Sequence, residues 1–138
     1  MDAPTADELR ADLVVLAAFA AAWADSFPDD PVLRHEEGGY IYCEAATGRV
    51  KVRRAMPGSE RTINLSHPPR VPGCFLVATY HTHPNSAALG WQPDPSLQDR
   101  IAADGSGVPW FVVAEQQVFV CGPKLRLGGL TGSPGYPI

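Results

Sequence analysis

The segment Cys74–His83 (CFLVATYHTH) gives the strongest strand signal in the chain, because β-branched and aromatic residues occur throughout it. Pro84 follows at once and has no N–H for a ladder hydrogen bond, so the strand is expected to end there. The sequence therefore predicts a β-sheet in which this strand ends at an exposed rim that carries His81 and His83.

These two histidines are two residues apart, and residues i and i+2 of a strand point to the same face of a sheet. Both imidazoles therefore leave one face together, as two nitrogen ligands of one zinc ion must, at about 2.0–2.1 Å each. Thr82, between them, is expected to face the other side. Alone, a histidine pair of this kind is only a weak indication of metal binding.

A catalytic zinc usually has three protein ligands and an open position for water. Asp94 and Asp99 are the candidates for the third ligand. Asp99 lies in the first turn of an expected helix that Ser96 begins, and a helical turn holds a carboxylate more rigidly than the proline-flanked loop around Asp94. We therefore expect Asp99 to be the ligand, with Asp94 as the alternative. Without a metal, Ser96 would be only an N-cap and Asp99 only a first-turn charge that the helix dipole favours.

The adjacent carboxylates Glu36 and Glu37 are the candidates for a general base beside the metal. Zinc lowers the pKa of its bound water to near 7, and protons must then move between that water and the leaving amine. Gly38–Gly39 follows and lets backbone come close. The alternative is that the two glutamates form a solvated turn. His35 and His67 are expected to be surface residues.

The N-terminal part of the chain predicts a helix, because Thr5 and Glu8 resemble a capping box. Apolar residues follow at spacings of three and four, and Pro28 and its neighbours end the pattern. They are Leu9, Leu13, Leu16, Ala20, Trp23 and Phe27. We expect this face to pack on the core.

The remaining segments predict a hairpin, a helix and two further strands. The expected elements are strands at Tyr40–Glu44 and Arg49–Met56, a helix at Ser96–Ala103, strands at Val108–Ala114 and Val118–Cys121, and a glycine- and proline-rich tail at Leu125–Ile138. The segment Pro57–Gly73 is expected to be mostly loop, with a short strand at Thr62–Leu65 as the alternative. This order predicts an α/β or α+β fold with a single β-sheet flanked by helices. We expect one domain over residues 1–138, with its core at about residues 6–123.

Composition narrows the function classes. The chain has 138 residues and a net charge of −4, and it shows no basic stripe, which argues against a nucleic-acid partner. The apolar run Leu13–Ala24 is too short to span a bilayer and follows an acid-rich segment, so neither a membrane span nor a signal peptide is expected. Cys43, Cys74 and Cys121 form no paired pattern, which favours a reducing cytoplasm.

The combination of Glu36, His81-Thr82-His83-Pro84 and Ser96-Leu97-Gln98-Asp99 resembles the JAB/JAMM (MPN+) zinc metalloprotease family. The family pattern is an upstream Glu, then H-(S/T)-H-P, then S-x-x-D. Alignment on the strand that follows HEEGG makes Glu36 the family Glu, with Glu37 as the alternative. The resemblance covers roughly Ala17–Pro123 and looks most like a bacterial branch that also occurs in polymorphic-toxin (Rhs-type) proteins.

The resemblance implies a mixed β-sheet flanked by helices, in the JAB/MPN (cytidine-deaminase-like) architecture, and one zinc ion. By carry-over, His81, His83 and Asp99 are the zinc ligands and Glu36 is the catalytic base. Ser96 would donate a hydrogen bond to the oxyanion. The implied activity is hydrolysis of peptide or isopeptide bonds, as in a deubiquitinase, with ubiquitin-like or other flexible C-terminal tails as candidate substrates.

The segment Asn85–Pro95 (NSAALGWQPDP) is longer than the family's usual gap. We expect it, with Trp91, to shape or cover the substrate groove. Two other functions stay open. The first is an inactive MPN-like scaffold or binding module. The second is a toxin-type effector hydrolase exported by a specialised secretion system.

Overall fold

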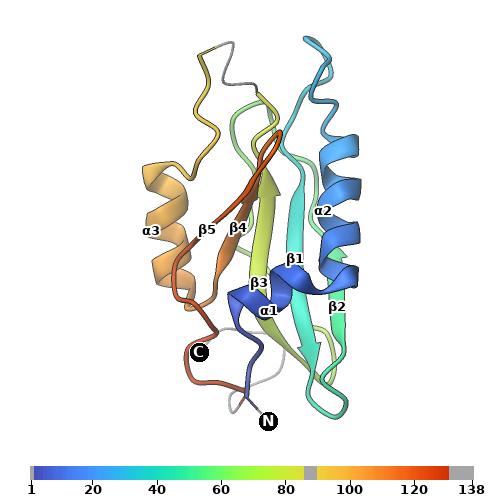
Figure 1. Cartoon of the computed structure of the whole chain (residues 1–138), viewed down its shortest axis with the longest axis vertical. Helices are drawn as coiled ribbons and strands as arrows, with labels where there is room; N and C mark the ends of the chain where they lie inside the picture. The colour runs from blue at the N-terminus through green and yellow to red at the C-terminus, as the bar shows by residue number, and fades with distance from the viewer. Residues whose placement is uncertain (1, 86–89, 131–138) are drawn as a thin grey trace.

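The computed structural model describes residues 2–85 and 90–130. The chain forms a five-stranded β-sheet in the order β2-β1-β3-β4-β5, with helices on both faces (Figure 1). The elements are α1 (Ala6–Ala11), α2 (Leu13–Asp25), β1 (Gly38–Glu44), β2 (Val50–Arg54), β3 (Cys74–Thr82), α3 (Leu97–Ser106), β4 (Trp110–Val113) and β5 (Val118–Cys121). Strands β3 and β4 are parallel and the other neighbours are antiparallel, so the predicted mixed sheet is confirmed.

Strand β3 is the centre of the sheet, and every one of its residues is buried. It pairs with β1 on one side and with β4 on the other. His83 lies directly after the strand, and its N–H donates to Val113 O at 2.8 Å. The backbone of both predicted zinc-binding histidines is therefore fixed by the sheet.

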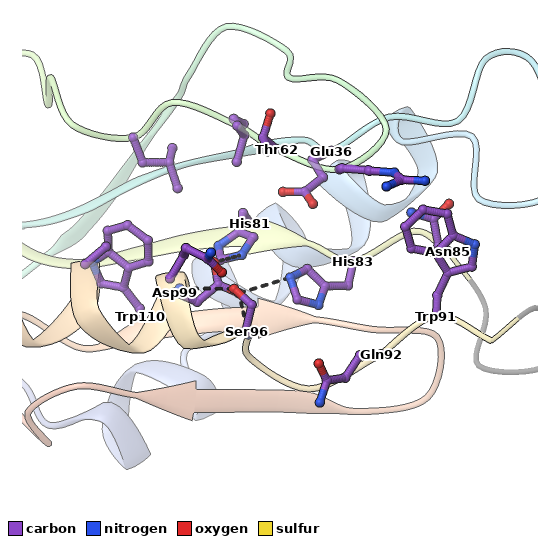
Figure 2. Close-up of a pocket in the computed structure, with 15 residues that line it drawn as sticks. Glu36, Thr62, His81, His83, Asn85, Trp91, Gln92, Ser96, Asp99 and Trp110 are labelled. Carbon is purple, nitrogen blue, oxygen red and sulfur yellow. Dashed lines mark hydrogen bonds and ion pairs between the residues drawn. The ribbon is translucent and has the colours of Figure 1, made fainter.

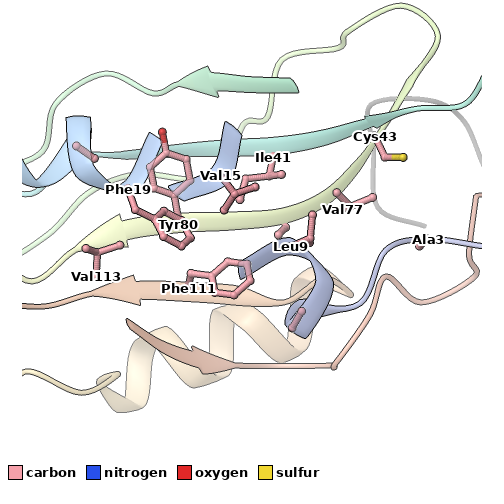
Figure 3. Packing of buried hydrophobic residues seen from close by; sticks show 13 residues of the cluster. Ala3, Leu9, Val15, Phe19, Ile41, Cys43, Val77, Tyr80, Phe111 and Val113 are labelled. Carbon is pink, nitrogen blue, oxygen red and sulfur yellow. The ribbon is translucent and has the colours of Figure 1, made fainter. Parts of the chain in front are cut away.

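Two apolar clusters fill the two faces of the sheet. On one face, α1 and α2 pack Leu9, Val15 and Phe19 against residues of β1, β3 and β4 such as Tyr80 and Phe111 (Figure 3). On the other face, the cluster is built from α3, the segment between β2 and β3, and further sheet residues. Its members include Tyr42, Leu65, Val71, Leu76, Ala103 and Trp110. The site described below lies on this second face.

The predicted N-terminal helix face is wrong at Leu13, Leu16, Ala20 and Phe27, which are exposed, whereas Leu9 is buried and Trp23 packs against the core as predicted. The chain forms two helices that meet at Asp12, which ends α1 and caps α2 by accepting hydrogen bonds from the N–H groups of its first turn. This break restarts the helical phase. Leu13 and Leu16 are therefore 82% and 44% exposed, while Val15, Phe19 and Ala22 face the core. The capping box of Thr5 and Glu8 is confirmed.

The segment after Cys121 returns to the N-terminus. Lys124 O accepts a hydrogen bond from Ala6 N–H at 2.7 Å, and Leu125 forms a β-bridge with Thr5. Arg126 is fully buried, with its guanidinium 5.0 Å from the ring centre of Phe75. Residues 131–138 of the predicted tail lie outside the described residues.

Two smaller findings concern single segments. The expected loop at Pro57–Gly73 is confirmed, and the alternative of a short strand at Thr62–Leu65 is not: the carbonyl of Thr62 accepts a hydrogen bond from Ser59 N–H within this loop. Among the described residues, none of the helices has the length and apolar character that crossing a membrane requires.

The Gly38–Gly39 pair begins β1, which lies between β2 and β3 in the sheet. A Cβ atom on Gly38 would lie 2.3 Å from Tyr80 O, and one on Gly39 would lie 2.3 Å from Arg53 O. The expectation that these glycines let backbone come close is therefore confirmed, and the backbone that they approach belongs to β3 and β2.

We predict that Gly38→Ala lowers the free energy of unfolding by roughly 2 kcal/mol or more, because the added methyl group must displace the backbone of β3. Urea unfolding measures this change. The control is Gly105→Ala in α3, where a Cβ meets nothing within 4 Å; there alanine is expected to stabilise by about 0.5–1 kcal/mol. Equal stability of the two variants would contradict the close approach.

Candidate metal centre

The predicted site residues line one pocket of about 490 Å³ beside the C-terminal end of β3 (Figure 2). Its walls come from the segment before β1, the loop after β2, the end of β3 and the start of α3. The lining residues are Glu36, Arg61, Thr62, Ile63, Leu65, His81, His83, Asn85, Trp91, Gln92, Ser96, Gln98, Asp99, Ala102 and Trp110. The two alternatives from the sequence, Glu37 and Asp94, are not among them.

The two imidazoles converge on one carboxylate. His81 Nε2 lies 3.2 Å from Asp99 Oδ1, and His83 Nε2 lies 3.2 Å from Asp99 Oδ2. His81 is 1% exposed, whereas the rim of the sheet was expected to be open. Asp99 of α3 and the ring of Trp110 in β4 lie against the imidazole of His81.

A capping box orients Asp99. Ser96 Oγ accepts a hydrogen bond from Asp99 N–H at 3.1 Å, and Asp99 Oδ2 accepts one from Ser96 N–H at 2.9 Å. The expected N-cap role of Ser96 is therefore confirmed. Although burial acts to raise it, the hydrogen bonds from His81 and His83 hold the pKa of Asp99 well below its usual range.

Glu36 stands beside the histidines. Ligand atoms of Glu36, His81 and His83 lie within 4.8 Å of one another, so these three form a possible metal-binding cluster that shares both histidines with the Asp99 contacts. Burial is the largest cause that raises the pKa of Glu36, to about 8; the charge of His83 acts to lower this pKa and the charge of Asp99 acts to raise it. Its carboxyl therefore exchanges a proton near neutral pH when no metal is bound.

The donor set fits a tetrahedral cation. Two ligands about 2.1 Å from an ion at the tetrahedral angle lie about 3.4 Å apart, close to the 3.2 Å that separates Asp99 from each imidazole nitrogen. His83 Nδ1 lies 3.2 Å from Pro93 O. Metal-binding histidines commonly donate their other ring N–H to a carbonyl in this way. If Nδ1 of a neutral His83 carries the proton and donates to Pro93 O, then Nε2 carries a lone pair that faces Asp99.

A lone pair facing a carboxylate is unfavourable, so His83 carries either a proton or a cation at Nε2. In the absence of a metal the proton is favoured: although burial opposes it, the hydrogen bond to Asp99 raises the pKa of His83. The other nitrogen of His81, Nδ1, is buried without a hydrogen-bond partner among the described residues. Asp99 alone therefore does not satisfy this ring.

Glu37 is engaged elsewhere. One oxygen accepts from Arg54 Nη1 at 3.0 Å, and the other lies 2.6 Å from His35 Nε2. Arg54 is paired in turn with Asp25. Glu37 is therefore a member of an ion-pair network away from the pocket. The expected surface position holds for His67, which is exposed, and in part for His35, whose side chain is 22% exposed.

The backbone around Glu36 is fixed from two sides. Its own N–H donates to Ser59 O at 2.7 Å, and its carbonyl accepts from Gly58 N–H at 2.9 Å. The next N–H, that of Glu37, donates to Thr82 Oγ1 at 3.0 Å, and Thr82 N–H donates to Glu37 O at 2.8 Å. The residue between the two histidines therefore also holds the peptide that follows Glu36.

A buried hydroxyl relay, Ser26–Thr82, extends this support to α2. Ser26 Oγ donates to Ala22 O at 2.8 Å and lies 2.6 Å from Thr82 Oγ1. Because Ser26 has one hydroxyl proton, Thr82 must donate to Ser26, which leaves a lone pair of Thr82 for Glu37 N–H. Sequence reasoning placed Thr82 on the opposite face correctly but gave it no partner; the S/T position of the H-x-H pattern was the available signal.

The segment before α3 contributes the outer wall of the pocket. Trp91 and Gln92 line it, and the guanidinium of Arg61 lies 4.7 Å from the ring centre of Trp91. Asn85 Nδ2 donates to Glu60 O at 3.0 Å. This agrees with the expectation that the long gap shapes the groove, although residues 86–89 of that gap lie outside the described part.

Comparison with known proteins gives one match. The family model described as prokaryotic homologs of the JAB domain matches residues 16–122, a range that contains every residue of the candidate centre. A search of curated proteins and a search of solved structures each found no match.

We predict that Thr82→Val, which keeps the side-chain shape but removes the hydroxyl, lowers the free energy of unfolding by roughly 2–4 kcal/mol, because the buried Glu37 N–H and Ser26 Oγ both lose a partner. Thr82→Ser keeps the hydroxyl and is expected to recover most of this loss. Urea denaturation of the three proteins measures it. A Thr82→Val protein as stable as wild type would show that the relay carries no stability.

The raised pKa of Glu36 predicts a pH dependence of stability in chelator-treated protein. The pKa of this carboxyl is near 4.5 in the unfolded chain and about 8 in the folded one. Its contribution to the free energy of unfolding is therefore fully present below pH 4.5 and is lost as the pH rises to about 8. Relative to Glu36→Gln, wild type should lose on the order of 2–4 kcal/mol between pH 5 and about 9. Denaturant unfolding across this range measures the difference. Glu115→Gln, at an exposed position, should follow wild type; a Glu36→Gln curve parallel to wild type would contradict the prediction.

Proposed function

From the premise that this chain belongs to the prokaryotic homologs of the JAB domain, we propose that it is a zinc-dependent hydrolase of peptide or isopeptide bonds. The observation that carries the proposal is the convergence of His81, His83 and Asp99 beside the buried carboxyl of Glu36. Two nitrogens and a carboxylate oxygen are a common donor set of catalytic zinc.

In this proposal His81, His83 and Asp99 hold the metal, and the capping box and the strand keep these ligands in place before it binds. Bound zinc supplies a water of lowered pKa and polarises a carbonyl oxygen. Of the alternative third ligands, Asp94 is less suitable because it does not line the pocket.

Glu36 acts as the proton carrier. It takes a proton from the attacking water and delivers it to the leaving amine, which requires a carboxyl that changes protonation state near the working pH. Its burial and its raised pKa meet that requirement in the metal-free chain. Glu37 cannot replace it, because Arg54 and His35 hold that carboxylate outside the pocket.

Ser96 donates a hydrogen bond to the oxyanion. As an N-cap its oxygen accepts from Asp99 N–H, and this contact leaves the hydroxyl proton of Ser96 for another acceptor. The same side chain can therefore cap α3 and stabilise developing negative charge in the pocket.

The substrate class in this proposal is a protein or peptide with an extended segment, such as a ubiquitin-like or other flexible C-terminal tail. An extended chain can bind by adding a strand beside a sheet, which reads backbone more than side chains. We place the reaction in the cytoplasm. Export as a toxin-type effector is the alternative, and neither setting involves nucleic acid or a membrane.

A second candidate is a non-catalytic binding module. The observation that favours it is that Asp99 already pairs with both histidines at 3.2 Å, so protonated imidazoles can form a closed ion-pair cluster without a metal. Metal content distinguishes the two candidates, because this alternative needs no zinc.

The test combines zinc analysis with cleavage of ubiquitin-like fusion proteins and a peptide library. Wild type is expected to hold about one zinc per chain and to cleave. Glu36→Gln should keep the zinc but lose about 10²–10⁴-fold in rate, and Asp99→Ala should lose the metal. Asp94→Asn is the matched control, with both properties retained. Equal cleavage by wild type and Glu36→Gln contradicts the role of Glu36; zinc-free wild type supports the binding module.

A further inference from the structure

The two ends of the pocket differ in chemistry. Trp110 lies at one end, where its ring centre is 5.9 Å from that of His81, and Ile63 and Leu65 pack in the same apolar cluster as Trp110. Trp91 and Asn85 lie at the other end, with the candidate metal centre between them (Figure 2). A substrate crossing the centre therefore meets a hydrophobic wall on one side and an aromatic, polar wall on the other.

Arg61 is the only arginine or lysine among the described residues that line this pocket. Its guanidinium lies over the indole of Trp91, 4.7 Å from the ring centre, and no acidic side chain of the described chain forms an ion pair with it. Arg34, Lys51 and Arg54 are each paired with a carboxylate, whereas Arg53 and Arg70 have no ion pair within the described chain but do not line the pocket.

The loop that carries Arg61 is held at several points. Ser59 N–H donates to Thr62 O at 2.8 Å, and Ser59 Oγ accepts from Thr62 N–H at 3.1 Å. Glu36 N–H reaches Ser59 O, and Asn85 donates to Glu60 O. The backbone that precedes Arg61 is thus fixed to the proposed base, Glu36, and to the segment after β3.

We propose that Arg61, held over Trp91, is a specificity-determining residue that binds a carboxylate of the substrate on the Trp91 side of the scissile bond. This inference rests on the proposed function. A guanidinium over an aromatic ring keeps N–H donors at its edge, and these donors match a carboxylate in a bidentate arrangement. An apolar side chain of the same substrate lies against Trp110 at the other end.

Charge supports the assignment to this one residue. The chain carries a net charge of −4, so its overall field repels acidic peptides. Within the pocket, the carboxylate of Asp99 already contacts both imidazoles and Glu36 is buried, so neither group offers a positive charge to a substrate carboxylate. Among the described residues, Arg61 is therefore the lysine or arginine of the pocket lining that can offer N–H donors to a substrate carboxylate.

The test measures binding to the Glu36→Gln protein as purified, so it does not depend on cleavage. The probes are fluorescein-labelled, C-terminally amidated octapeptide mixtures with Glu, Gln or Lys fixed at each position in turn, and a Gln mixture with a free C-terminal carboxylate. Fluorescence anisotropy should show about tenfold tighter binding of Glu than of Gln at one or two neighbouring positions, with Lys weakest. A preference for the free-carboxylate mixture instead assigns the same contact to a chain end.

The added Arg61→Met change should reduce the carboxylate preference to less than about twofold, while binding of the amidated Gln mixtures stays unchanged. Arg70→Met, at an exposed arginine outside the pocket, is the matched control and should keep the full preference. The inference is overturned if no mixture shows a carboxylate preference, or if the Arg61→Met protein keeps it. Cleavage of the same mixtures by wild type tests the proposed function separately.

Discussion

The contact on which the candidate centre depends is the carboxylate of Asp99 between two imidazoles that leave one end of β3. It joins the central strand of the sheet to the first turn of α3, and both of its sides are fixed before any ligand arrives. The sheet fixes the backbone of His81 and His83. The capping box with Ser96 fixes Asp99. Such preorganisation is what a catalytic metal centre requires of its protein.

The second requirement, a carboxyl beside the proposed metal ligands, is met by Glu36, whose backbone is supported from the opposite face of the sheet. Thr82 points away from the pocket, yet its hydroxyl binds the peptide after Glu36 and its partner Ser26 belongs to the end of α2. The helical layer therefore contributes to the position of Glu36 although it lines no part of the site. The same backbone hydrogen bonds tie Glu36 to the loop that carries Arg61, so the proposed proton carrier and the outer wall of the pocket form one unit.

The features that were predicted correctly from the sequence depend on residues close together in the chain. The H-x-H spacing fixed the face of both histidines, S-x-x-D indicated the capping box, and Gly38–Gly39 indicated close backbone contact. The predicted helix face failed at Leu13 and Leu16 because Asp12 accepts hydrogen bonds from two N–H groups of a new helix, and apolar spacing does not reveal this break. Contacts between distant segments, such as Ser26 with Thr82 and Arg61 with Trp91, have no periodicity and required the fold.

The central claim is that one zinc ion occupies the space between His81, His83 and Asp99. The most direct measurement is anomalous diffraction at the zinc edge from crystals grown with zinc. The account predicts one strong peak about 2.0–2.1 Å from the Nε2 atoms of both histidines and about 2.0–2.2 Å from an oxygen of Asp99. No peak in the pocket, or a peak coordinated by Asp94 with Asp99 turned away, would contradict it.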